Sequence, residues 1–273
     1  MQPFIKWAGG KRQLLPEIIG RLPKEFNNYY EPFIGGGALL LELQPKNAVI
    51  GDVNMTLITT YKIIEETPNE LMKILSEYET KHNNSDDKKV FYYEMRDSFN
   101  KKLENNIYDI YTSALFIYLN KTCFNGLFRV NSKGLFNVPF NNKKEVKTYD
   151  TDNIRDISKY MKHVDAAVRD FEETCKTACK GDFIFFDSPY VPLNDDSFQS
   201  YTKEGFSLDE HVRLSKLYKE LSDKGVYCML TNHNTKLIND LYKDFRIDVV
   251  NVKRLINRDA NKRTGEEVII TNY

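Results

Sequence analysis

Several features are missing from this sequence, and each absence excludes a class of protein. The 39 basic and 39 acidic side chains give a formal net charge of zero over 273 residues, which argues against an indiscriminate polyanion binder. No apolar run approaches the roughly 20 residues that a membrane-spanning helix needs. Residues 1–7 show no basic tip followed by an apolar signal-peptide core. We therefore expect a cytoplasmic protein without a membrane partner.

Cysteine is scarce, and its spacing matches no known metal motif. The four cysteines form no CxxC pair, and no neighbouring His or Cys completes a zinc set. We interpret all four as reduced thiols and expect no metal site. They are Cys123, Cys175, Cys179 and Cys228.

Basic side chains nevertheless gather in two windows of the chain. Residues 120–148 hold six Lys or Arg against one acidic residue, and residues 251–265 hold five against one. A charged stretch is usually only a solvated surface. Two such windows beside loop signals make nucleic acid a candidate partner.

Short apolar runs alternate with helical periodicity along most of the chain. This alternation predicts an α/β fold, with a mostly parallel sheet and helices on both faces. The region of about 67–147 breaks the alternation, and we interpret it as an inserted helical domain between the two parts of a catalytic domain, 1–66 and 148–273. The expected strands are 29–33, 48–51, 164–169, 183–186, 226–230, 247–252 and 267–271. The expected helices are 38–43, 57–66, 69–81, 90–104, 108–121, 208–222 and 235–242, and a further helix is expected to begin at Arg12.

A glycine-rich turn, Gly35–Gly37, closes the first expected strand. Glycines here let the backbone pass close to a ligand. Asp52 ends the next strand, where a carboxylate can bind a ribose hydroxyl. Leu40 occupies the third glycine position of the dinucleotide fingerprint GxGxxG and obstructs a dinucleotide. The turn alone could be a tight connection, but together with Asp52 it favours a nucleotide-like ligand.

Two further segments offer groups to such a ligand. Residues 7–11, Trp-Ala-Gly-Gly-Lys, do not form a phosphate loop because Ile5 and Arg12 replace the required Gly and Ser or Thr. They still offer backbone N–H groups and a lysine to an anion. Asp170-Phe171, after the third strand, pairs a carboxylate with an aromatic ring and suits an adenine edge.

The tetrapeptide Asp187–Tyr190, Asp-Ser-Pro-Tyr, ends the fourth expected strand. Alone it could simply turn the chain. It lies, however, at the same carboxyl edge of the predicted sheet as the glycine turn, where open α/β sheets bind their ligands. We therefore expect it to face a substrate.

Read in order, these motifs resemble the Dam-like DNA adenine-N6 methyltransferases of the alpha class, and the resemblance covers nearly the whole chain. It implies a Rossmann-like methyltransferase sheet with an antiparallel last strand and a helical target-recognition insert. It also implies S-adenosylmethionine as methyl donor, double-stranded DNA as partner, GATC as target and a monomer or weak dimer in a prokaryotic cell or phage-infected host. The matching segments are 6–11, 31–37, 52–54, 125–131, 134–140 and 181–190.

The resemblance also implies a role for individual residues. Catalysis would rest on Asp187, Ser188, Pro189 and Tyr190. The cofactor would contact Trp7, Ala8, Gly9, Gly10, Lys11, Glu31, Pro32, Phe33, Gly35, Gly37, Ala38, Asp52, Val53, Asn54, Asp170, Phe171, Asp187 and Pro189. DNA would contact Lys6, Arg12, Asn120, Phe124, Asn125, Leu127, Arg129, Asn137, Pro139, Ser200 and Tyr201.

Physical chemistry supports several of the DNA roles. Arg129 can bond a guanine edge bidentately in the major groove. Phe124 and Leu127 are apolar residues in a basic loop, so they could fill the stack left by an extruded base or simply anchor the loop to the core.

The same holds for the catalytic motif. Asp187 can accept one N–H of the adenine amino group, and the Ser188 carbonyl can accept the other. The Asp187 charge then stabilises the positive charge that develops as the methyl group arrives. An aspartate with an ordinary pKa near 3.9 is a weak base, so we expect no deprotonation before attack. Tyr190 can stack on the extruded adenine, and Pro189 fixes the turn.

Two positions depart from the family pattern. Ser188 stands where the family most often has proline; because its role is assigned to the main chain, we expect its hydroxyl to be dispensable. Asn141–Lys143 replace the usual Gly-Arg-aromatic after Phe140, which weakens the GATC expectation. Two alternatives stay open: a methyltransferase acting on RNA or a protein amide, and a non-catalytic DNA-binding relative.

Overall fold

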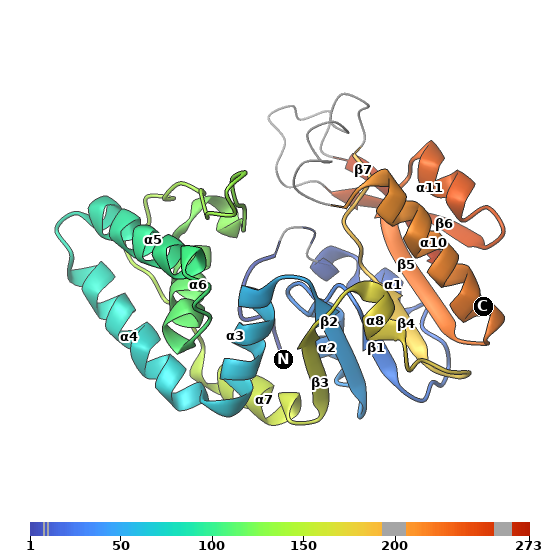
Figure 1. Cartoon of the computed structure of the whole chain (residues 1–273), viewed down its shortest axis with the longest axis horizontal. Coiled ribbons are helices and arrows are strands. Elements are labelled where there is room, and N and C mark those ends of the chain that lie inside the picture. Colours follow the sequence, from blue (N-terminus) through green and yellow to red (C-terminus); the bar gives the residue numbers. More distant parts are fainter. Residues whose placement is uncertain (8, 10, 193–205, 254–263) are drawn as a thin grey trace. The chain divides into compact units, whose positions relative to one another are not determined.

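The computed structural model describes residues 1–7, 9, 11–192, 206–253 and 264–273 (Figure 1). The chain forms two compact units, each assembled from separate segments. The first comprises residues 1–10, 35–44 and 52–168; the second comprises 11–34, 45–51 and 169–273.

The described strands form a seven-stranded sheet in the order β3-β2-β1-β4-β5-β7-β6. Strand β1 runs parallel to β2 and β4, and β4 runs parallel to β5. The last strand, β7, is antiparallel to both β5 and β6. This confirms the predicted Rossmann-like α/β sheet with an antiparallel last strand. The bounds are β1 Tyr29–Glu31, β2 Ala48–Asp52, β3 Val164–Val168, β4 Phe183–Phe186, β5 Tyr227–His233, β6 Arg246–Lys253 and β7 Thr264–Thr271.

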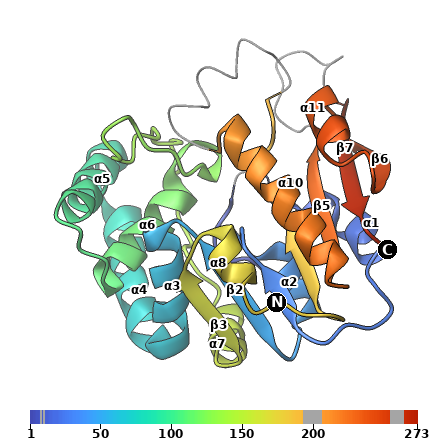
Figure 2. The same ribbon diagram turned by 45° about the vertical axis from the view of Figure 1, so that its right-hand side comes forward.

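The core of the second unit lies between its strands and three helices. All four side chains of β4 are buried, as expected for a central parallel strand covered on both faces. Phe186, Leu230 and Ile270 from the strands pack in one cluster with Tyr218 and Tyr242, and α10 lies along β5 (Figure 2). The helical segments of this unit are η1 Lys11–Gln13, α1 Leu15–Ile19, α8 Phe171–Cys175, α10 Leu208–Asp223 and α11 Lys236–Leu241.

Helices dominate the first unit, and α6 is its centre. Ten of the thirteen residues of α6 are buried, which is the pattern of a helix surrounded by others; α3, α4 and α5 pack against it (Figure 1). Asp109 begins α6 with a capping box that includes Thr112. The helices are α2 Ala38–Leu43, α3 Met55–Glu66, α4 Pro68–Asn84, α5 Lys88–Glu104, α6 Ile110–Thr122, η2 Phe124–Gly126 and α7 Thr151–Met161.

Two helices, α7 and α8, are absent from the sequence expectations. Helix α7 is mostly polar, but Ile154, Ile157 and Met161 form one buried stripe, and Asp150 caps its start. Strand β5 also continues to His233, three residues beyond the end expected at Leu230. That extension carries polar side chains to the carboxyl edge of the sheet.

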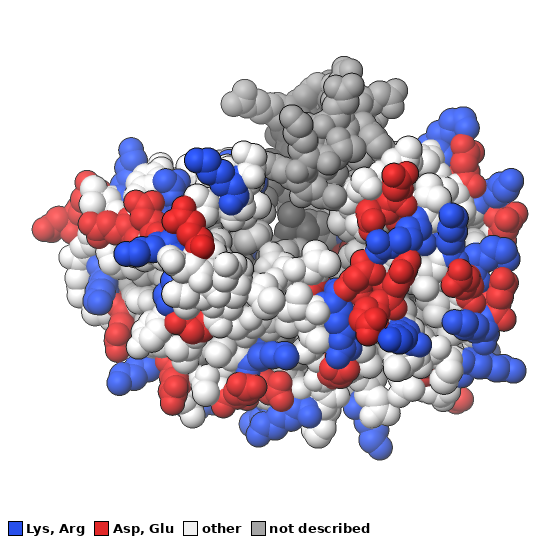
Figure 3. Space-filling model, viewed as in Figure 1, with Lys and Arg blue, Asp and Glu red and all other residues white. Residues whose placement is uncertain are grey.

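Charged side chains of both signs share the surface, in keeping with the formal net charge of zero. On the face drawn in Figure 3, basic and acidic side chains are interspersed. Among the described residues, no helix is long and apolar enough to cross a membrane, and no group of three or more His, Cys, Asp or Glu could hold a metal ion.

Candidate active site

Asp187, directly after β4, is held by two partners from distant parts of the second unit. The Nζ atom of Lys11 lies 2.6 Å from Oδ1 of Asp187, and the Thr231 hydroxyl donates to the same oxygen at 3.0 Å. The Lys11 side chain is only 5% exposed, against 21% for Asp187. Both of these contacts are made by Oδ1 of Asp187.

The pKa of Asp187 is raised above its usual range, because burial penalises the charged carboxylate. Lys11 and Thr231 oppose this rise by stabilising the charged form. The ordinary pKa assumed from the sequence is therefore wrong. A raised pKa makes Asp187 a stronger hydrogen-bond acceptor and a better base than a solvent-exposed aspartate.

The Tyr190 ring is fixed on several sides. Its hydroxyl donates to Oε2 of Glu267 at 2.7 Å, and its ring meets His233 edge-on with centroids 4.8 Å apart. The Lys11 Nζ lies 4.4 Å from the ring centroid, a cation–π distance. Burial raises the pKa of Tyr190 well above its ordinary value, so the side chain remains a neutral phenol.

Ser188 lies between these two residues and is 2% exposed. Its Oγ accepts from Nδ2 of Asn232 at 3.4 Å. The Oδ1 atom of Asn232 in turn accepts from the backbone N–H of Val191 at 2.9 Å. The hydroxyl therefore takes part in a buried network that ties the turn to β5, and the main-chain role of Ser188 stays a prediction.

The glycine turn belongs to the first unit. Gly35 has φ +46°, a region that favours glycine, and a Cβ there would lie 2.6 Å from Cδ1 of Trp7. Its backbone N–H donates to Oδ2 of Asp52 at 3.3 Å, and its carbonyl accepts from the Tyr61 hydroxyl at 3.2 Å. Gly37, with φ +66°, begins α2. Only glycine fits the Gly35 position.

Asp52 is partly buried, and its carboxylate is oriented by backbone groups. Besides Gly35, the N–H of Asn54 donates to Oδ1 at 2.9 Å. Burial raises the pKa of Asp52, while these hydrogen bonds lower it. Asn54 caps α3 by accepting from the Leu57 N–H at 3.0 Å, and Val53 is 75% exposed. Of these three predicted cofactor residues, Asp52 and Asn54 have locally fixed side chains.

Asp170 and Phe171 form a separate group in the second unit. The Phe171 ring stacks on Phe33 with centroids 5.5 Å apart, and the Arg213 guanidinium lies 4.1 Å from the Phe171 centroid. The Asp170 carboxylate accepts from the Glu172 N–H at 2.9 Å and pairs with Arg213. The predicted adenine acceptor thus already carries a cationic partner.

Two further predicted cofactor residues, Glu31 and Pro32, are buried. The Tyr29 hydroxyl donates to Oε2 of Glu31 at 2.7 Å. Phe33 and Ala38 are half-buried, and Gly9, with φ +79°, is exposed. Ala8, Gly10, Ser200 and Tyr201, and the side chain of Arg12, lie outside the described residues.

In the first unit, Asn120 joins the N-terminal segment to the predicted recognition loop. Its Oδ1 accepts from the Lys6 N–H at 2.8 Å, and its Nδ2 donates to the carbonyls of Lys6 at 2.8 Å and Gly126 at 2.9 Å. Asn120 is buried. This amide therefore places the Lys6 backbone and the loop side by side.

The loop itself presents exposed side chains. Arg129 donates from Nε to Oδ1 of Asn137 at 2.8 Å, and the N–H of Asn137 donates to the Arg129 carbonyl at 3.1 Å. Phe124 is 51% exposed, and its N–H donates to the carbonyl of exposed Pro139 at 2.8 Å. Asn125 is also exposed, with φ +56°, and Leu127 is half-buried.

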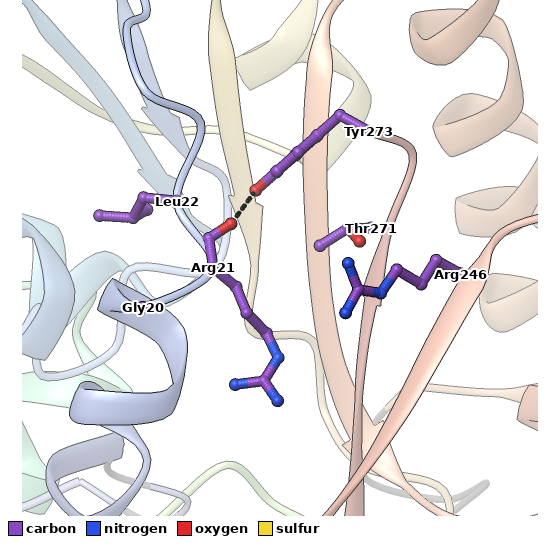
Figure 4. Close-up of a pocket in the computed structure, with 6 residues that line it drawn as sticks. All are labelled: Gly20, Arg21, Leu22, Arg246, Thr271 and Tyr273. Atoms are coloured by element: carbon purple, nitrogen blue, oxygen red, sulfur yellow. Dashed lines mark hydrogen bonds between the residues drawn. The ribbon is translucent and has the colours of Figure 1, made fainter.

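One open hollow of about 540 Å³ lies apart from these groups (Figure 4). In the sheet register, Thr271 of its lining pairs with Met229 near the start of β5, whereas Asp187 contacts Thr231 further along that strand. The hollow is therefore at the amino end of the strands, away from the Asp187 group. Its lining residues are Gly20, Arg21, Leu22, Arg246, Thr271 and Tyr273.

The model of the D12 class N6 adenine-specific DNA methyltransferases matches residues 7–256. The chain belongs to this family. The match includes the glycine turn, the recognition loop and Asp187–Tyr190, and it confirms the predicted resemblance and the prediction of an adenine-specific DNA methyltransferase. It leaves the RNA, protein-amide and non-catalytic alternatives without support.

Full-length relatives agree with the family assignment. The chain is 40% identical to the type II methyltransferase M1.LlaDCHI of Lactococcus lactis subsp. cremoris, over all of this chain and 96% of the relative. It is 41% identical to the type II methyltransferase M.MjaIII of Methanocaldococcus jannaschii, over all of this chain and 99% of the relative. A DNA adenine methylase of Haemophilus influenzae is 31% identical, over all of this chain and 93% of the relative.

Several groups of predicted residues thus come together in this methyltransferase. Lys11 joins Asp187 and Tyr190; Trp7 and Asp52 meet at Gly35. In the DNA-binding prediction, the structure joins pairs of residues: Lys6 with Asn120, Arg129 with Asn137, and Phe124 with Pro139.

The sequence reasoning missed the partners of the catalytic motif. Thr231 binds Asp187 and Glu267 binds Tyr190, yet neither was a candidate. One signal was available: Thr231, Asn232 and His233 are polar residues directly after an apolar strand pattern. Glu267 has no such local signal, because only the register of β7 on β5 brings it to this edge.

Proposed function

We propose that the protein transfers a methyl group from S-adenosylmethionine to N6 of an adenine that is flipped out of duplex DNA at a defined sequence. The observation that carries this proposal is the fixed Asp187 carboxylate. Lys11 and Thr231 hold its Oδ1, and the side chain remains 21% exposed. A carboxylate that is oriented in this way and still accessible suits an amino group.

The chemistry follows from the adenine amino group. Its nitrogen is a poor nucleophile because its lone pair is delocalised into the ring. In the proposal, Oδ2 of Asp187 accepts one N–H and the Ser188 carbonyl accepts the other. These two bonds favour a tetrahedral nitrogen, whose lone pair is localised and can attack the methyl group. The negative charge of Asp187 stabilises the positive charge that develops on the nitrogen. After the methyl group has been transferred, the N–H proton bonded to Asp187 is lost through this carboxylate to water, which leaves neutral N6-methyladenine. Lys11 keeps the buried carboxylate ionised before the reaction.

The residues present fit S-adenosylmethionine, which would supply an electrophilic methyl group and leave as S-adenosylhomocysteine. Asp52, oriented by two backbone N–H groups, suits the ribose hydroxyls. Phe33, Asp170 and Phe171 offer aromatic surface and a carboxylate to the adenine ring. The backbone at Gly35, where a side chain has no room, suits the methionine part.

DNA recognition belongs to residues 67–147 in this proposal, with residues 1–66 and 148–273 as the catalytic domain. Arg129, oriented by Asn137, reads a guanine edge. Exposed Phe124 fills the gap that the flipped adenine leaves. Flipping is needed because the target amino group is inaccessible to an active site while it is paired and stacked in a duplex. We propose GATC as the target, as the resemblance implies.

The test uses tritiated methyl S-adenosylmethionine with the purified protein and three acceptors: duplex DNA, RNA and protein. We expect label in N6-methyladenine of duplex DNA, and background label with Asp187→Ala. Asp209→Ala, which removes an exposed carboxylate of the first turn of α10, should leave the rate unchanged. Label found in cytosine, RNA or protein instead would overturn the proposal, as would full activity of Asp187→Ala.

A further inference from the structure

Tyr190 lies outside the regular strands, so the sheet ladder does not fix its side chain. Besides the Lys11 cation, a pair of residues on two neighbouring strands holds it. His233 of β5 and Glu267 of β7 are directly opposite each other in the antiparallel register, and directly opposite residues place their side chains on the same face of a sheet. Both contact Tyr190: His233 at the ring and Glu267 at the hydroxyl.

The two contacts restrict different motions of the ring. The edge-on contact with His233, with centroids 4.8 Å apart, limits sideways movement. The hydrogen bond to Glu267 at 2.7 Å fixes the far end of the side chain. His233 is held in turn, because its Nδ1 bonds the Val191 carbonyl at 2.7 Å. These contacts hold the ring in the orientation that the structure shows, and the contact at the hydroxyl comes from a residue 77 positions further along the chain.

We propose that Glu267 is a positioning residue for methyl transfer, which orients the Tyr190 ring through the hydrogen bond to its hydroxyl. This inference rests on the proposed function, in which Tyr190 stacks on the flipped adenine. Glu267 touches neither the base nor the methyl donor in this account. A ring that tilts away from the base leaves the amino group out of line with its acceptors, and such misplacement slows the chemical step more than it weakens binding.

Three substitutions distinguish whether Glu267 acts through its hydrogen bond to Tyr190, through its negative charge or only by supporting the fold. Glu267→Gln keeps an acceptor oxygen and removes the charge. Glu267→Ala removes both, and Tyr190→Phe removes the donor while keeping the ring. Glu266→Ala is the matched control, because Glu266 is the neighbouring exposed glutamate and bonds Asn234 at 2.7 Å instead.

We expect Glu267→Ala and Tyr190→Phe each to lower kcat about tenfold, with KM for DNA changed by less than about threefold. Glu267→Gln should stay within about twofold of the wild type, since an amide oxygen also accepts from a phenol. The double variant Tyr190→Phe/Glu267→Ala should be no slower than either single variant, because both remove the same hydrogen bond. Glu266→Ala should match the wild type.

Several outcomes would overturn the inference. Additive losses in the double variant would show that Glu267 acts on something other than the Tyr190 hydroxyl. Equal losses in Glu267→Gln and Glu267→Ala would assign the effect to charge, and an unchanged kcat in Glu267→Ala would remove the role altogether. The wild-type protein is measured first: if it transfers no methyl group to adenine, the proposed function fails, whereas a failure confined to the Glu267 variants leaves that function standing.

Discussion

The turn after β4 and the recognition loop hold their polar side chains in opposite ways. At the turn, Asp187 and Tyr190 are fixed by residues from other strands, 44 and 77 residues away in the chain. In the loop, Arg129 is exposed and bonds Asn137, only eight residues away. The catalytic side chains at the turn are thus held by distant strands, whereas the exposed Arg129 side chain is held by a residue of its own loop.

This difference follows from what each region is proposed to do. A group that takes part in a reaction must keep one orientation, which distant and partly buried partners provide. A group that reads DNA must remain accessible and adapt to a groove, so local support suffices. Substitutions at the turn should therefore change the rate of methyl transfer, whereas substitutions in the loop should change the choice of DNA.

The largest effect should come from the turn. Asp187→Asn should lower kcat by about a thousandfold, since it removes the charge that stabilises the transition state, while the far-ultraviolet circular dichroism spectrum stays unchanged. Asp182→Asn is the comparison, because Asp182 lies just before the other end of the same strand and bonds Asn28 and Cys179. That variant should lower Tm but keep the kcat of the folded protein. The reverse pattern would contradict the assignment.

A change in the loop should alter the choice of DNA instead of the chemistry. Arg129→Ala should reduce discrimination between target and non-target duplexes roughly tenfold to a hundredfold, the usual worth of a bidentate contact to guanine. Single-turnover rates on saturating target DNA should change far less. Competition binding and single-turnover assays measure the two separately. If Arg129→Ala lowered only the rate of the chemical step, Arg129 would act in catalysis and not in DNA recognition.

Lys11 should influence how the rate of methyl transfer depends on pH, because it contacts Asp187. Its cation favours the ionised form of Asp187, whose pKa burial has raised. Lys11→Met should therefore raise that pKa further and reduce the ionised fraction at any given pH. Since methyl transfer needs the carboxylate, the acid limb of the kcat profile should move to higher pH. An acid limb that stays in place, or moves to lower pH, would show that Lys11 does not control the charge of Asp187.

The smallest effect should come from the hydroxyl of Ser188. Ser188→Ala should keep most of the activity, because the proposed acceptor is the main-chain carbonyl. It should cost about 1 kcal/mol in the free energy of unfolding, since the buried Asn232 amide loses its partner. Denaturant unfolding and initial rates measure both quantities. A folded but inactive Ser188→Ala protein would give the hydroxyl a direct role.

Much of the fold was predictable from local pattern. The apolar run Phe183–Phe186 matches β4 residue for residue, and the glycine turn leads into α2 as expected. The same reasoning made Asp187 a candidate, because a carboxylate at the end of a strand is a local signal. Arg129 became a candidate through the family resemblance, and its partner Asn137 is close in sequence. The roles of both residues stay predictions.

The features that could not be predicted from the sequence depend on packing between residues that are far apart in the chain. Glu267 reaches Tyr190 only because β7 pairs with β5 in one register, and no spacing in the chain encodes that pairing. Asn120 was expected to bind DNA, yet the structure shows a buried amide that bonds Lys6 and Gly126. The pKa of Asp187 depends on burial, which a strand-end motif does not reveal.

The central claim is that the Asp187 turn methylates adenine at a defined sequence, and one measurement tests it most directly. Modified-base sequencing is applied to DNA from cells without adenine methylation that express either the wild type or Asp187→Asn. We expect N6-methyladenine within one short recurring sequence, proposed to be GATC, in the wild type and none in the variant. Modified cytosine, adenines without a shared sequence, or equal methylation in both samples would contradict the account.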